Sequence, residues 1–181
     1  MAFLNRLVTD YKLTAQQENI EFLLYSTIVF IIPFSLGHPQ WLVGTIVNAA
    51  LVLAGLNLPL QKTLPIIILP SIAVLSRGLL FGPYTPALIY TLPFIWLGNS
   101  TLVSALKIES IHHKQRRIII GIIGKVTLLT ISALALIQFE LIPKALLVGM
   151  SIFQLITAIS GALLAKSIHY AKKKYLATTQ P

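Results

Sequence analysis

Six long apolar segments alternate with short polar segments along the chain. A helix that crosses a membrane needs about 20 mostly apolar residues. Segments of roughly that length recur six times, and prolines, glycines or charges separate them. The predicted spans are residues 14–36, 41–60, 64–81, 83–106, 118–139 and 143–165. This pattern predicts an all-α, polytopic membrane protein with six transmembrane helices.

Local signals mark several of the predicted helix ends. Thr14 followed three residues later by Gln17 is the sequence pattern of a capping box, which begins the first helix. Pro59 closes the second span, and the segment SRGLLFGPYTP (76–86) combines two glycines and two prolines in the turn between the third and fourth spans. Within the fourth span, LGNST (97–101) predicts either a helix break or the point where the helix reaches the interface.

Composition supports a bilayer as the solvent of this chain. Of the 181 residues, 56% are hydrophobic and only 10% are charged, and the mean hydropathy is +0.83. A soluble domain is usually about 25% charged. We therefore expect one integral membrane domain over residues 1–181, with an amphipathic surface helix over 1–13 and a polar C-terminal tail over 171–181.

Charge indicates how the helices are oriented. The net charge is +9, and no motif of interleaved basic and aromatic residues points to nucleic acid. With both termini in the cytoplasm, eleven of the 14 lysines and arginines lie in inside segments and only Arg77 and Lys144 lie outside. The positive-inside rule thus predicts cytoplasmic termini in a plasma membrane, and the loop IHHKQRR (111–117) is expected to anchor on anionic lipid headgroups.

Several function classes have no residues to support them. The chain has no cysteine, which excludes thiolate metal sites and cysteine nucleophiles. Its five acidic residues include no pair within the spans, so we expect no enzyme activity, no cofactor and no metal site. No channel filter or inverted repeat typical of coupled carriers is visible.

Polar residues within the spans are the best candidates for function, since they usually face a bundle interior. Asn48 shares a helical stripe with Gly44, and Gln154 lies among small residues of the sixth span. Each is interpreted either as an interhelical contact or as a ligand contact. Lys125 either extends towards the cytoplasmic interface or has a pairing or coupling role.

The predicted outer turns gather further polar side chains. They carry His38, Trp41, Arg77, Tyr84 and Glu140, which we expect to line a pocket floored by Asn48 and Gln154. Arg77 is expected to lie about one helical turn below the outer surface. Three roles stay open for it: extension to the interface, pairing with Glu140, or binding an anionic group of a solute.

A pocket that opens outward and small residues for helix contact favour a substrate-capture subunit. In size, basic charge and six-helix topology over residues 14–170, the chain resembles the substrate-binding S component of energy-coupling factor transporters. The sequence Ala50-Leu-Val-Leu-Ala54 is similar to the family's Ala-x-x-x-Ala docking pattern. The resemblance implies capture of a small solute and docking, through Ala50 and Ala54, to a scaffold subunit with separate ATPases. The alternative is a structural or assembly protein whose polar residues only join helices.

Overall fold

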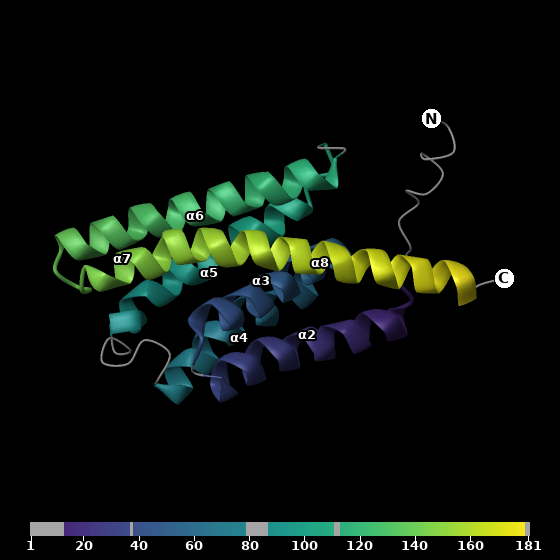
Figure 1. Cartoon of the computed structure of the whole chain (residues 1–181), viewed down its shortest axis with the longest axis horizontal. Coiled ribbons are helices and arrows are strands. Elements are labelled where there is room, and N and C mark those ends of the chain that lie inside the picture. The colour runs from purple at the N-terminus through teal and green to yellow at the C-terminus, as the bar shows by residue number, and fades with distance from the viewer. Residues whose placement is uncertain (1–12, 37, 79–86, 111–112, 180–181) are drawn as a thin grey trace.

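In the computed structural model, every regular element of the described residues is a helix. The structure describes residues 13–36, 38–78, 87–110 and 113–179. Figure 1 shows the elements running roughly side by side as an up-and-down bundle. They are α2 (Ala15–Ser35), α3 (Gln40–Asn57), α4 (Leu60–Arg77), α5 (Leu88–Leu106), α6 (Lys114–Gln138), α7 (Ala145–Met150) and α8 (Ile152–Thr179).

The prediction of six apolar helices is confirmed within the described part of the chain. Six helical segments are long and apolar enough to cross a membrane, the last one running from Ala145 to Lys172. An even number of spans brings the start of α2 and the end of α8 to the same end of the bundle (Figure 1). We call this end the terminal end; Ala15, Asn57 and Lys172 lie there. We call the opposite end the distal end; Ser35, Gln40 and Arg77 lie there.

The helix boundaries follow local chemistry. Thr14 forms the expected capping box, because its hydroxyl accepts from Gln17 N (3.3 Å) while Thr14 N donates to Gln17 Oε1 (2.9 Å). α4 begins at Leu60, four residues before the predicted start. It ends at Gly78, whose φ of 70° is the left-handed conformation that glycine adopts without strain.

The structure decides between the two alternatives for LGNST. The break does not occur, since α5 is continuous from Leu88 to Leu106. The segment expected as a polar tail is helical as far as Thr179, as the end of α8. The predicted surface helix over residues 1–13 lies, apart from Leu13, outside the described residues.

α3 is the central helix of the bundle. It packs on α8, α2, α5 and α4. Half of the residues in its apolar segment are buried, which is the largest share among the six spans found in the described residues. Ala50 and Ala54 are therefore both buried, at 4% and 0% exposure. The expectation that these alanines form a docking face is not met: neighbouring helices of the same chain already cover them.

Small residues let the central helices approach closely. A Cβ on Gly161 of α8 would lie 2.8 Å from both Ala49 N and Thr45 O of α3. A Cβ on Gly121 of α6 would lie 3.0 Å from Leu102 O of α5. In a membrane, where burial of apolar surface gives helices no preference for each other over lipid, such contacts are the main source of packing energy.

We predict that Gly161→Ala destabilises the bundle. The added methyl group would meet the α3 backbone, which cannot rotate away, and overpacking costs about 1–3 kcal/mol. Gly124→Ala is the matched control, because its Cβ meets only Thr101 Cγ2, the end of a side chain. Thermal unfolding in detergent should show a lower midpoint for Gly161→Ala than for Gly124→Ala. Equal midpoints would contradict the close α3–α8 contact.

Candidate functional site

Lys125 is buried at the centre of the bundle. Its residue exposure is 3%, and Nζ donates to Asn48 Oδ1 at 2.6 Å. The side chain therefore crosses from α6 to α3 rather than extending along α6 to the interface. Of the two interpretations drawn from the sequence, the structure contradicts extension and agrees with pairing. The partner is an amide, which the sequence alone did not identify.

Asn48 connects three helices through its side-chain amide. Its Oδ1 accepts from Lys125 of α6, and its Nδ2 donates to Gly44 O (2.9 Å) of α3 and to Thr157 Oγ1 (3.2 Å) of α8. Asn48 lies eight residues into α3, which at the helical rise is about 12 Å from the distal end. The amide is thus an interhelical contact at mid-bundle, and its oxygen orients the lysine.

A cavity of about 110 Å³ adjoins this centre. It extends from residues at the distal starts of α3 and α5, such as Gln40 and Leu88, to Lys125 and Asn48. Most of its wall is apolar, and its polar side chains include Lys125 and Asn48 in the deep part and Gln40 at the distal start of α3. Besides Lys125, Asn48 and Thr157, the polar side chains in the wall are those of Gln40, Ser71, Asn99 and Gln154.

The polar groups of α4 and α5 in the wall are held by hydrogen bonds. Asn99 Nδ2 donates to Ile67 O at 3.1 Å, and Trp96 Nε1 donates to Ser71 Oγ at 2.6 Å. Pro70, which also lines the cavity, has no N–H to donate to the carbonyl four residues before it. The amide of Asn99 therefore contacts α4 in the turn where the proline has removed a backbone bond.

Two of the residues predicted to bind a ligand line the cavity. Asn48 and Gln154 form part of its wall, as the sequence suggested. Lys125, Asn99 and Ser71 also line it but were not among the predicted ligand contacts. Their signal in the sequence is a polar residue inside an apolar span, a signal shared by residues that only join helices.

The remaining predicted residues of the outer turns do not line this cavity. His38 and Trp41 are exposed, and Tyr84 lies outside the described residues. Glu140 is also exposed, and its backbone, with φ of 56°, ends α6 through a bond from Glu140 N to Ile137 O. Its position is thus explained by the chain reversal after α6.

Arg77 has a structural contact that the sequence did not suggest. Its Nη1 donates to Phe34 O at 2.5 Å and also to Ser35 O, at the C-terminal end of α2. The last carbonyls of a helix have no partner within it and carry partial negative charge. Arg77 satisfies two of them and joins α4 to α2, and no ion pair with Glu140 is found in the described structure.

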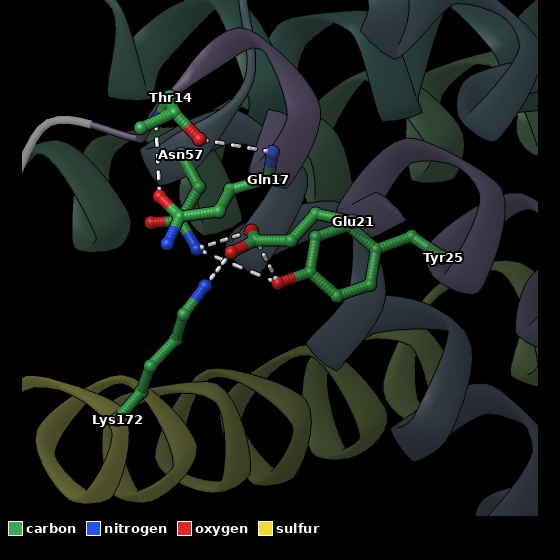
Figure 2. A network of polar contacts seen from close by, with 6 residues as sticks. All are labelled: Thr14, Gln17, Glu21, Tyr25, Asn57 and Lys172. Carbon is green, nitrogen blue, oxygen red and sulfur yellow. Dashed lines mark hydrogen bonds and ion pairs between the residues drawn. The ribbon is translucent and has the colours of Figure 1, made fainter. Parts of the chain in front are cut away.

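A second polar network lies near the terminal end. Figure 2 shows three side chains converging on the buried carboxylate of Glu21 in α2. Tyr25 Oη and Asn57 Nδ2 each donate to Glu21 Oε2 at 2.9 Å, and Lys172 of α8 forms an ion pair with Oε1. The carboxylate thereby joins α2, α3 and α8 at the terminal end. The cavity extends from the opposite, distal end.

Two lysines at this end make further contacts. Lys62 forms an ion pair with Glu18 at 3.0 Å, with both side chains partly exposed. Lys107 is half-buried, its Nζ donates to Leu58 O, and burial lowers the pKa of its amine below the usual range. The first contact joins α4 to α2, and the second joins the α5–α6 connection to the α3–α4 connection.

We predict that Asn48→Leu destabilises the protein more than the double variant Asn48→Leu with Lys125→Met does. The single change leaves Lys125 buried without its acceptor, and an unsatisfied buried polar group costs about 1–3 kcal/mol, or more when charged. The double variant Asn48→Leu with Lys125→Met should recover much of the stability. Thermal midpoints of the single and double variants in detergent measure this, and a double variant no more stable than Asn48→Leu would contradict the bond.

We also predict strong coupling between Glu21 and Lys172. Contacting residues in one network have interaction energies of about 0.5–3 kcal/mol, whereas exposed ion pairs give about 0–1 kcal/mol. A double-mutant cycle of Glu21→Gln and Lys172→Gln should therefore give the larger coupling. The same cycle on Glu18 and Lys62 is the matched control, and equal couplings would count against the buried network.

Comparison with known proteins gives no further guide to this site. The chain matches no known family model, no curated protein and no solved structure.

Proposed function

We propose that this protein captures a small solute within the membrane. The solute enters from the distal end and binds in the cavity beside Lys125. The protein itself is not catalytic, and it releases the solute through the action of separate partner subunits that supply energy. The proposed cellular location of the protein is the plasma membrane, with both chain termini in the cytoplasm.

The observation that carries this proposal is the cavity at mid-bundle. Binding sites for small molecules are typically concave and mostly apolar, with a few polar groups that fix orientation. This cavity has that composition, and its volume of about 110 Å³ is somewhat below the roughly 150 Å³ of an engineered cavity that holds benzene. A solute of a few non-hydrogen atoms is the size that fits.

Charge distribution supports entry from the outside. The basic side chains of the described residues lie mostly at the terminal end, where cytoplasmic loops carry excess lysine and arginine. At the distal end only Arg77 and Lys144 are basic among the described residues. With the terminal end in the cytoplasm, the cavity extends from the outer face towards the membrane centre.

Partner subunits are proposed on the resemblance to energy-coupling factor S components and on what the chain lacks. We find no nucleotide-binding motif in the sequence, so energy for release would come from another protein, such as an ATPase and its scaffold. Because Ala50 and Ala54 are buried, that contact would use a different surface from the one that the resemblance implies.

A structural role is the second candidate, and one observation favours it. The amides of Asn48 and Asn99 are already bonded to protein groups, as expected of residues that only join helices. The two candidates differ in one measurable property. A capture protein gains stability from its solute, whereas a structural protein does not.

A screen of small solutes by thermal unfolding of the purified protein tests this proposal. A ligand that binds only the folded state stabilises it, by about 2.7 kcal/mol at a concentration of 100 times Kd. We expect at least one solute to raise the midpoint, and Leu92→Trp, which fills the cavity, to abolish that shift. Leu97→Trp is the control, since Leu97 lies on the same helix, is 54% exposed and does not line the cavity.

Two results would overturn solute capture in this cavity. One is a screen in which no compound raises the midpoint of the wild-type protein. The other is a shift that persists unchanged in Leu92→Trp, which would place the binding site elsewhere. Co-purification with a large complex, together with the first result, would favour the structural role.

A further inference from the structure

We propose that the captured solute is a small monocarboxylate whose anionic group binds Lys125. This inference rests on the proposed function and names the class of its substrate. It comes from the charge balance at the deep end of the cavity, from the donors left on Lys125 and from the apolar wall around them.

Lys125 has no acidic partner among the described residues. Glu18 and Glu21 lie at the terminal end, where they pair with Lys62 and Lys172. Glu109 and Glu140 are exposed at the ends of the bundle. The cavity wall contains amides and hydroxyls but no carboxylate. Because a buried charge is costly unless it is paired, an anion entering the cavity would supply the missing counter-charge.

The geometry of Lys125 leaves donors for such an anion. An ammonium group has three N–H donors and no acceptor. Asn48 Oδ1 accepts one of them, and it is the one partner of Nζ found in the described structure. Lys125 also lines the cavity, so its other donors are within reach of a bound group. The Asn48 bond holds the lysine at this depth beside the cavity.

The charge count favours one negative charge rather than two. Lys125 is the single cation in the wall described by the structure. A carboxylate would balance it, whereas a doubly charged phosphate would leave a buried net charge. A carboxylate has two acceptor oxygens, and the half-buried Gln154 offers a further amide in the wall.

The apolar part of the wall indicates the rest of the solute. Towards the distal end the cavity is lined by Pro33, Val43, Val74, Leu88 and Phe153, together with the amide of Gln40. The five apolar side chains offer no hydrogen bonds, so they fit a short alkyl body. The volume, which is below that of a cavity that holds benzene, limits that body to a short chain.

Paired probes of equal shape test the class of solute. The probes are acetate, propionate and butyrate, each compared with its neutral amide. The measurement is the thermal midpoint of the full chain in detergent at constant ionic strength. We expect at least one acid to raise the midpoint while its amide does not. In Lys125→Met, which keeps an unbranched side chain one atom shorter and without charge, the acid should bind about tenfold more weakly or worse.

The outcomes separate this inference from the proposed function. If amides stabilise the protein as well as acids do, and Leu92→Trp removes both shifts, solute capture stands and the carboxylate class is wrong. If an acid stabilises wild type and Lys125→Met equally, the assignment to Lys125 is wrong. If no acid shifts the midpoint although other compounds of the solute screen do, the class is overturned while capture stands. A loss of folding in Lys125→Met is checked with Lys125→Gln, for which the same loss of acid binding is expected.

Discussion

The hydrogen bond from Lys125 to Asn48 is the contact on which the centre of the bundle depends. A charged side chain in the middle of a membrane helix costs about 2.5–3.5 kcal/mol on insertion scales. The chain accommodates Lys125 by surrounding it with α3, α5 and α8 and by giving Nζ an oxygen at 2.6 Å. The same amide then holds Thr157 of α8, so that one polar group sets the positions of three helices.

Close packing allows this polar centre to form. Gly44 and Gly161 remove side-chain volume between α3 and α8 on either side of Asn48. A bulkier residue at either position would separate the helices and lengthen the bond from Asn48 to Thr157. The cavity lies on the distal side of this contact, and its wall is mostly apolar and includes Pro33 and Pro70.

The two ends of the bundle are held by different chemistry. At the terminal end, the carboxylate of Glu21 joins α2, α3 and α8 through side chains alone (Figure 2). At the distal end, Arg77 joins α4 to the final carbonyls of α2. The terminal network fixes α8 against α2 and α3, and the distal half keeps a cavity between its helices. This difference is consistent with a site that is reached from the distal end.

The sequence by itself determined the helices of this protein. Apolar segments of spanning length, the Thr14 capping box and Gly78 are local signals, because backbone hydrogen bonds in lipid must be satisfied within each segment. It also identified Asn48 and Gln154 as interior polar residues. Only the tertiary structure decided which helix is central. Because α3 is central, Ala50 and Ala54 are buried, although the sequence suggested that they form a docking face. The tertiary structure likewise decided the partners of Lys125 and Arg77, since an intramembrane polar residue has several possible partners on other helices, and spacing along one helix cannot choose among them.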